Sequence, residues 1–375
     1  MATDPRQRYP RPTIACWDSG SRDMSDLEAP ETHDSLEGIT PPVMTLRVEG
    51  HLEERKFLAN AVREKQLHHG LIFEGERGVG KATIAFHLAN LLLTGDGGSV
   101  GHDLPSPDVN ASGFRQIVQG SHPGLLYLSR PRNEQKTGYK SAITIDEIRR
   151  VQRFFSMTAA QNDAYRVVVI DPVNDLNRNA ANALLKLLEE PPARAVFILI
   201  AHGTGGLLPT IRSRCQILKF APLSDVDVGT IVRRQLGNVE NAQADRTAAL
   251  GGGSARRALV FARFGGLELM EALRTYLDTP LPDPRKGHKL AEIAATRGSD
   301  IHRDILRELL LERLHAEAMS AARRGNLPAA EAVAGADIAF QERMRLADAF
   351  NLDRKQEFLT LLSDIHDILR SARAA

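Results

Sequence analysis

Five short apolar runs predict the strands of one sheet. They are continuous rather than alternating, which is typical of strands buried on both faces of a parallel sheet covered by helices. Between the first two runs, the stretch from Gly95 to Gly120 is rich in Gly, Ser, Asp and Pro, and it predicts a loop insertion. The pattern as a whole predicts an α/β domain. The runs are Leu71–Phe73, Leu125–Leu128, Val167–Ile170, Val196–Ile200 and Gln216–Phe220.

Two changes of pattern divide the chain into segments. Residues 1–42 hold six of the 19 prolines and few aliphatic residues, so they predict a disordered tail. A helical pattern begins at Leu46, and no further strand pattern follows Pro222. We therefore expect a tail at 1–42, an α/β domain at 43–221, short helices at 222–267 and longer amphipathic helices at 268–375.

Composition narrows the possible classes of function. Lys and Arg number 48 against 47 Asp and Glu, so a nucleic-acid contact would need a local basic patch rather than a global field. Cys16 and Cys215, the two cysteines, are too few for a zinc module or a disulfide framework, which fits a reducing cytoplasm. No apolar stretch approaches the ~20 residues of a membrane span, and no apolar signal segment follows the N-terminal charges. We expect a cytoplasmic protein with no membrane contact.

A glycine-rich stretch follows the first predicted strand and opens a helix. Gly75, Gly78 and Gly80 allow backbone N–H groups to surround an anion, the helix N-terminus adds partial positive charge, and Lys81 would reach the phosphates. This arrangement predicts a site for ATP. The alternative is a glycine-rich turn with a surface lysine.

The expected apparatus for metal binding and hydrolysis is incomplete. Ala82 stands where a hydroxyl usually holds Mg²⁺, and Thr83 is one residue late, about 100° around the helix. Asp171 ends the third strand run and could hold Mg²⁺ through water, or it could only cap the next turn. Pro172 follows, at a position where many P-loop ATPases have a glutamate that orients the attacking water molecule. We expect ATP binding with weak or absent Mg²⁺ and little or no hydrolysis.

Four segments together resemble the bacterial clamp-loader family of AAA+ proteins. The resemblance covers roughly residues 44–270 and implies an AAA+ P-loop domain, a small helical lid at 222–267 and an all-α collar at 268–375. Two further segments, Ser121–Pro123 and Ile143–Ile148, fit one subunit of this family, and the degraded hydrolysis site fits the same subunit. The four segments are Gly75–Thr83, Val167–Asp171, Ala181–Pro192 and Ile211–Cys215.

The resemblance implies a role in DNA replication. The chain would be a stator and arginine-finger donor in the ATP-dependent loading of a sliding clamp onto primed DNA for DNA polymerase III. Its partners would be the gamma/tau and delta subunits, and the clamp would be contacted indirectly. Arg214, in Ser213-Arg214-Cys215, corresponds to the finger that enters a neighbour's ATP site, and its alternative role is a structural ion pair. Arg256 corresponds to the lid arginine that touches nucleotide bound in the same subunit.

The sequence departs from the family at two points, and two alternative functions stay open. Many relatives carry a four-cysteine zinc module between the first two strands, but Gly95–Gly120 contains no cysteine, so no zinc is expected. The polar residue expected after the fourth strand is replaced by Ala201-His202-Gly203.

A hydrolysing motor subunit similar to gamma/tau is the first alternative function, and Ala82 and Pro172 argue against it. An unrelated P-loop kinase or helicase-like protein is the second, and it would not explain Ser213–Cys215.

Overall fold

The chain forms two compact units, Met1–Leu259 and Val260–Ala375. The computed structural model describes residues 27–95, 101–133, 138–156, 164–203, 207–296, 300–350 and 353–374. The division falls inside helix α9 (Ala255–Arg263), before the expected boundary at 267/268. Residues 222–259 are therefore part of the first unit, and the reason is their packing on the glycine-rich loop described below.

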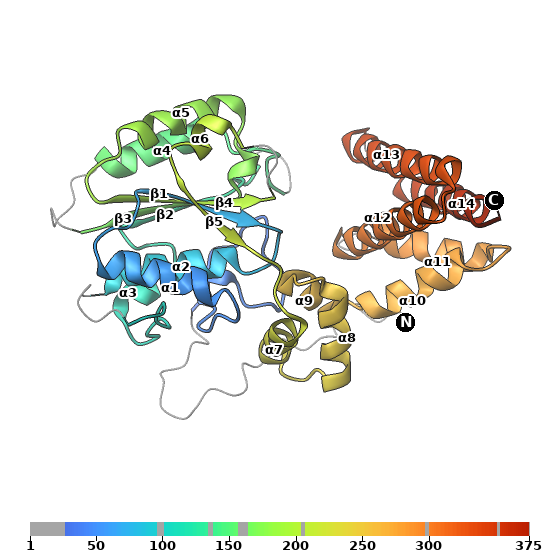
Figure 1. Cartoon of the computed structure of the whole chain (residues 1–375), viewed down its shortest axis with the longest axis horizontal. Coiled ribbons are helices and arrows are strands. Elements are labelled where there is room, and N and C mark those ends of the chain that lie inside the picture. The colour runs from blue at the N-terminus through green and yellow to red at the C-terminus, as the bar shows by residue number, and fades with distance from the viewer. Residues whose placement is uncertain are drawn as a thin grey trace, which may run out of the picture. The chain divides into compact units, whose positions relative to one another are not determined.

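The first unit is built on a parallel sheet in the order β2-β3-β4-β1-β5 (Figure 1). All five predicted strands are confirmed. Successive residues point to opposite faces, so Leu71 and Phe73 enter one core while Ile72, between them, enters the other. The strands are β1 (Gly70–Gly75), β2 (Leu125–Leu128), β3 (Arg166–Ile170), β4 (Ala195–His202) and β5 (Gln216–Phe220).

Helices cover both faces of this sheet (Figure 1). One face is covered by α1 (Leu52–Arg63) and α2 (Lys81–Thr94), and the other by α4 (Ile145–Ser156), α5 (Arg178–Glu189) and α6 (Pro209–Arg212). Three short helical segments follow the sheet: α7 (Asp225–Leu236), α8 (Asn241–Gly251) and the start of α9. The predicted fold class, an α/β P-loop domain with a five-stranded parallel sheet followed by helices, is confirmed.

The insertion between β1 and β2 is not a plain loop, so that prediction was wrong. Residues 96–100 lie outside the described part, but Ser112–Val118 form helix α3. Phe114, Ile117 and Val118, spaced i, i+3 and i+4, are all at most 3% exposed. Burial of this short apolar face stabilises a helix that the surrounding Gly, Ser and Pro residues conceal in the sequence.

The predicted disordered tail requires a correction in its second half. Residues 1–26 lie outside the described part. Residues 27–42 pack on the first unit, ending in the 3-10 helix η3 (Pro42–Met44). Leu36 and Ile39 are partly buried, and the Thr40 N–H donates to Gln235 Oε1 at 3.0 Å. Proline fixes φ in advance, so a proline-rich segment loses less conformational entropy on packing than its composition suggests.

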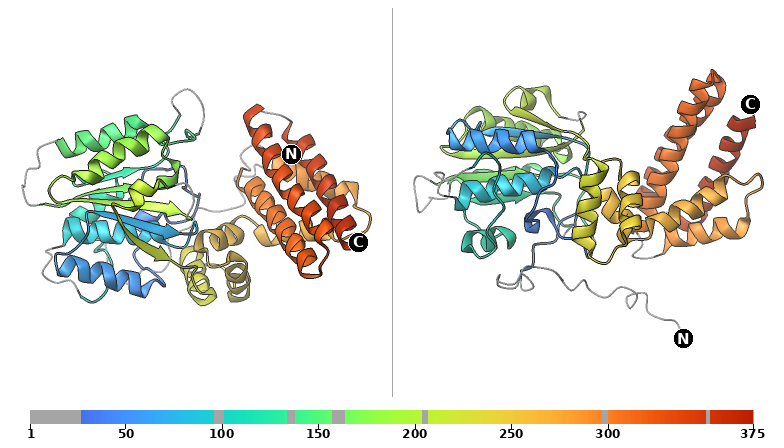
Figure 2. Two further views of the ribbon diagram at one scale, coloured as in Figure 1. Left: turned by 45° about the horizontal axis from the view of Figure 1, so that its top comes forward. Right: turned by 60° about the horizontal axis from the view of Figure 1, so that its bottom comes forward.

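The second unit is entirely helical in the residues described (Figure 2). Within this unit α12 packs along α13, and α11 packs along α14. Leu306, Leu310 and Leu314 of α12 are fully buried, which agrees with the amphipathic pattern. The helices are α10 (Gly266–Leu277), α11 (Pro284–Ala295), α12 (Asp300–Arg323), α13 (Leu327–Phe350) and α14 (Arg354–Ala374).

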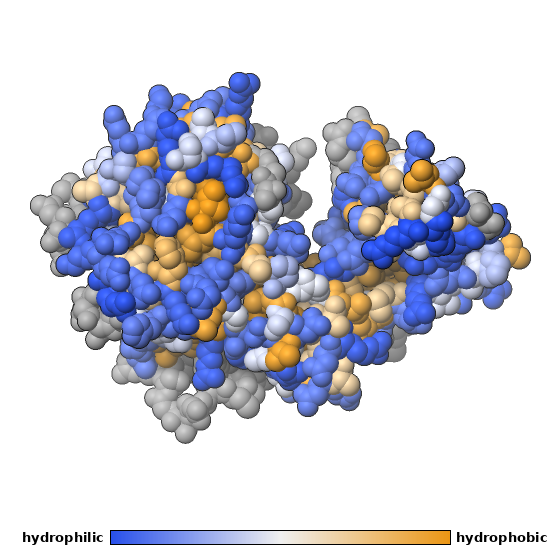
Figure 3. All heavy atoms as spheres, in the orientation of Figure 1, coloured by the Kyte–Doolittle hydropathy of each residue, from blue (hydrophilic) through white to orange (hydrophobic). Residues whose placement is uncertain are grey.

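Apolar side chains on the surface form patches between hydrophilic ones (Figure 3). Val226 of α7 and Ile338 of α13 are 75% and 72% exposed. Scattered apolar side chains of this kind are normal on folded proteins. Among the helices described, none combines the length and the apolar character needed to cross a membrane.

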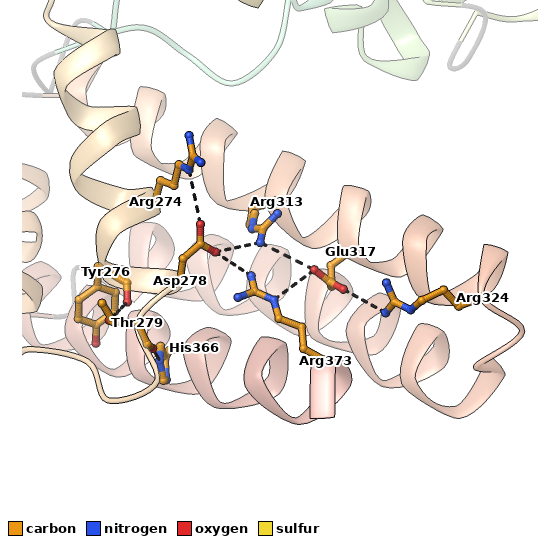
Figure 4. A network of polar contacts seen from close by, with 9 residues as sticks. All are labelled: Arg274, Tyr276, Asp278, Thr279, Arg313, Glu317, Arg324, His366 and Arg373. Carbon is orange, nitrogen blue, oxygen red and sulfur yellow. Dashed lines mark hydrogen bonds and ion pairs between the residues drawn. The ribbon is translucent and has the colours of Figure 1, made fainter. Parts of the chain in front are cut away.

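A network of ion pairs joins three helices of the second unit (Figure 4). Asp278, after α10, accepts from Arg313 of α12 at 3.0 Å and from Arg373 of α14 at 2.9 Å. Glu317 of α12, which is 7% exposed, lies 3.3 Å from Arg324 and 3.4 Å from Arg373. One nearly buried carboxylate therefore fixes α14 against α12.

Removing the charge of Glu317 should destabilise the second unit. We expect Glu317→Gln to lower the free energy of unfolding by about 1–2 kcal/mol, because its arginine partners keep some access to water. The measurement is urea unfolding of the full chain. Glu331→Gln, at an exposed position of α13, is the matched control. Equal effects of the two changes would show that the network contributes nothing.

Candidate functional site

The glycine-rich loop between β1 and α2 has the backbone of an anion cradle. Gly78 and Gly80 have φ angles of +85° and +105°, in the left-handed region that favours glycine. Gly80 also caps the N-terminus of α2, which begins at Lys81. The loop therefore presents its backbone at a helix N-terminus, where partial positive charge favours a phosphate.

The start of α9 rests directly on this loop. A Cβ at Gly78 would lie 2.3 Å from Ser254 Oγ and 2.6 Å from Arg256 Cβ. Ser254 Oγ donates to the Arg77 carbonyl at 2.9 Å, and the Arg256 N–H donates to the Gly78 carbonyl at 3.3 Å. This contact places Arg256 beside the cradle, and its contact with a nucleotide stays a prediction.

Lys81 is almost completely buried, at 3% exposure. Its Nζ donates to the Gly75 carbonyl at 2.8 Å and to the Glu76 carbonyl. Burial lowers the pKa of Lys81 to about 8, although the charges of Asp171 and Glu76 oppose this shift. The ammonium is thus held at the loop by neutral carbonyls, and a phosphate would be a stronger acceptor than either of them.

Asp171 lies at the end of β3 and is 8% exposed. Tyr127 Oη donates to its Oδ2 at 3.2 Å. Burial, followed by the nearby charge of Asp34, raises the pKa of Asp171 to about 7. Pro172, the next residue, has no side-chain carboxylate. The sequence analysis missed Tyr127, although a hydroxyl in the otherwise apolar run Leu125–Leu128 was a possible signal.

A cavity of about 450 Å³ brings most of the predicted site residues together. His202, the last residue of β4, lies in its wall. Burial, and then the charges of Lys81 and Arg77, lower the pKa of His202 to about 4, so the imidazole is neutral at pH 7. Gly75 does not line the cavity, but its carbonyl oxygen accepts a hydrogen bond from Lys81 Nζ. The predicted residues in the lining are Gly78, Gly80, Lys81, Thr83, Asp171 and Arg256.

Another part of the cavity wall comes from the segment that we predicted to be disordered. Residues 29–43, which we call the strap, contribute Pro30, Asp34, Ile39 and others to the lining. The Asp34 carboxylate pairs with Arg77 and with Arg256. The sequence analysis missed this wall because the segment has neither the period of a helix nor that of a strand.

Arg214 lies far from this cavity, immediately before β5. In the register of β1 and β5, Leu71 at the start of β1 faces Gln216. The P-loop begins at the other end of β1, about 17 Å away along the strand. Arg214 Nη2 lies 2.8 Å from Glu189 Oε1, and the Arg214 side chain is 37% exposed. The arginine is thus paired, accessible and out of reach of this chain's own phosphate cradle.

Two other groups of interest do not form sites. Burial raises the pKa of Cys215 to about 12, which does not suit a nucleophile. In the described part of the chain, no three His, Cys, Asp or Glu side chains lie close enough together to bind a metal. That no zinc is bound stays a prediction.

Comparisons with known proteins show what the chain resembles. Residues 50–224 match the family model described as "DNA polymerase III, delta subunit". DNA polymerase III subunit delta' of Bacillus subtilis (strain 168) is 32% identical over 199 residues, which is 51% of this chain and 56% of that protein. The chain resembles the delta-prime subunit of bacterial DNA polymerase III.

Further relatives extend this similarity. Subunit delta' of Pseudomonas aeruginosa is 35% identical over 147 residues, covering 39% of this chain and 41% of that protein. Subunit tau of Escherichia coli (strain K12) is 35% identical over 184 residues, covering 49% of this chain and 26% of that protein. The chain spans about half the length of the delta' proteins it matches. The matched part is similar to the delta', gamma and tau subunits of DNA polymerase III.

The tight contact at Gly78 leads to a stability prediction. Gly78→Ala should lower the free energy of unfolding by about 3 kcal/mol, because alanine adds both backbone strain and a clash with Ser254 and Arg256. Gly252→Ala is the matched control, since Gly252 has a φ of +56° and no atom within 4 Å of the added Cβ. It should cost only about 1 kcal/mol. Equal losses in urea unfolding would contradict the docking of α9 on the loop.

Proposed function

We propose that this chain is a clamp-loader subunit that donates Arg214 to the ATP site of a neighbouring subunit. Its partners would be the gamma/tau and delta subunits, and the assembly would load the sliding clamp onto primed DNA for DNA polymerase III. The observation that supports the proposal is the position of Arg214, at the edge of the sheet opposite this chain's own P-loop. A phosphate reached by Arg214 must belong to another chain.

The chemistry of Arg214 suits such a role. A guanidinium offers planar, forked donors to a γ-phosphate and stabilises the charge that develops in phosphoryl transfer. Arg214 Nη1 also donates to the Thr210 carbonyl at 2.9 Å, and the ion-pair partner Glu189 is 48% exposed in the side chain. Exposed ion pairs of this kind contribute about 0–1 kcal/mol, so exchange for a phosphate would be inexpensive. The ion pair and the finger are therefore compatible roles.

The chain's own site suits ATP binding better than hydrolysis. The backbone at Gly78 and Gly80 and the buried ammonium of Lys81 fit a triphosphate. Mg²⁺ fits less well. Ala82 offers no ligand, and the raised pKa of Asp171 favours its protonated form, which binds a metal less well than a carboxylate. Pro172 cannot orient a water molecule. The subunit would be a fixed part of the assembly rather than its motor.

A hydrolysing motor subunit similar to gamma/tau is the second candidate. The similarity to subunit tau of Escherichia coli favours it. Ala82 and Pro172 oppose it, because both stand at positions that serve metal or water rather than the phosphate cradle. ATP turnover by the purified chain separates the two candidates.

In the isolated chain we expect ATP to bind without turnover. Calorimetry with ATP and Mg²⁺ should show binding, which Lys81→Ala should weaken by about tenfold or more, because the ammonium is the main charged donor at the loop. A phosphate-release assay run in parallel should stay at background. Turnover that Lys81→Ala abolishes would favour the motor candidate.

In the assembled loader we expect Arg214→Ala to lower ATP hydrolysis without affecting assembly. An arginine finger contributes about 10³ to 10⁵ in rate at one site, but the loss would be diluted if other sites remain intact. The measurement is hydrolysis stimulated by DNA and clamp, in a complex of the chain with candidate gamma/tau and delta subunits whose mass has been verified. Arg214→Lys should rescue poorly, because an ammonium lacks the planar fork. Wild-type hydrolysis by an intact Arg214→Ala complex would refute the finger role.

A further inference from the structure

The strap crosses the nucleotide cavity and is attached on both sides of it. On the β2 side, Glu31 pairs with Arg132, which follows that strand. On the α7 side, the Thr40 N–H donates to Gln235 Oε1 at 3.0 Å. Between these attachments the strap lines the same cavity as the P-loop. It therefore forms part of the wall around the cradle.

A turn near the middle of the strap brings Asp34 to the cradle. The Thr32 N–H donates to Ser35 Oγ at 2.8 Å, and the Ser35 N–H donates to the Thr32 carbonyl at 3.1 Å. The Asp34 carboxylate pairs with Arg77 and lies 3.4 Å from Arg256 Nη2. Arg256 Nη1 also donates to the Asp34 carbonyl at 2.7 Å. Asp34 thus holds the lid arginine by both its side chain and its backbone.

Asp34 is kept in its charged, deprotonated form in this position. Burial alone would raise the pKa of Asp34, but the charges of Arg256 and Arg77 outweigh it and keep the pKa below its ordinary value. A carboxylate and a phosphate oxygen are both anionic acceptors for the same guanidinium donors. An incoming phosphate would therefore find Arg77 and Arg256 already paired, and it would meet a negative charge beside the cradle.

We propose that the strap is an autoinhibitory closure of the nucleotide site, in which Asp34 occupies Arg77 and Arg256 beside the phosphate cradle. The proposal rests on the nucleotide binding proposed above. ATP binds by displacing Asp34 from Arg256 and lifting the strap. The apparent association constant for ATP is then that of the open site multiplied by the fraction of time that the strap is open.

The test compares Asp34→Asn with a matched variant in the full chain. Asp34→Asn removes the competing charge and should tighten ATP binding about tenfold by calorimetry, within the range usual for coupled equilibria. Glu37→Gln removes an exposed carboxylate of the same strap and should leave the affinity unchanged. Adenosine should bind both variants as it binds wild type, because it carries no phosphate to compete with Asp34.

Hydrogen exchange provides an independent readout of strap movement. ATP should increase amide exchange in residues 29–43 of the wild-type chain, and adenosine should not. Unchanged ATP affinity in Asp34→Asn would overturn the closure while leaving nucleotide binding intact. Tighter binding without increased exchange would show that Asp34 only repels phosphate and that the strap stays in place, which also overturns the closure. Absence of ATP binding in wild type and in Asp34→Asn would refute the nucleotide site and the closure together.

Discussion

The missing side chain of Gly78 is the constraint on which the nucleotide site depends. Because no Cβ stands there, Ser254 and Arg256 can approach the glycine-rich loop closely enough to bond to its backbone. That contact joins the helices after the sheet to the P-loop and makes residues 222–259 part of the first unit. It also fixes Arg256 where a phosphate and the strap's Asp34 would both require it.

The parallel sheet explains why Arg214 and Arg256 lie at opposite ends of the strands. Parallel strands all end at the same edge, so the P-loop after β1, Asp171 after β3 and His202 at the end of β4 meet around one cavity. Arg214 precedes β5 and lies at the other edge. The length of one strand separates the two edges, and no side chain spans it.

The sequence predicted the sheet well because every strand is buried on both faces, which leaves an uninterrupted apolar run. The P-loop was equally visible, since Gly78, Gly80 and Lys81 are adjacent in the chain. Helix α3 and the strap were missed because their burial depends on tertiary contacts. Three residues of α3 supply its apolar face, and the strap packs through prolines, Leu36 and Ile39 without any repeat. The pairing of Asp34 with Arg256 joins residues 222 positions apart, and a single sequence carries no signal for it.

The same geometry is compatible with the proposed subunit, which would bind a nucleotide without hydrolysing it. Loss of the residues that hold metal and water at Ala82 and Pro172 leaves the backbone of the loop and Lys81 unaffected, because these serve the phosphates alone. If the site does not hydrolyse ATP, as proposed, it does not need rapid nucleotide exchange, and an internal carboxylate can share its arginines. The Asp34 carboxylate pairs with both Arg77 and Arg256, and so offsets the repulsion between these two like charges. The proposed closure would therefore stabilise the fold of the first unit and restrain its site through one set of contacts.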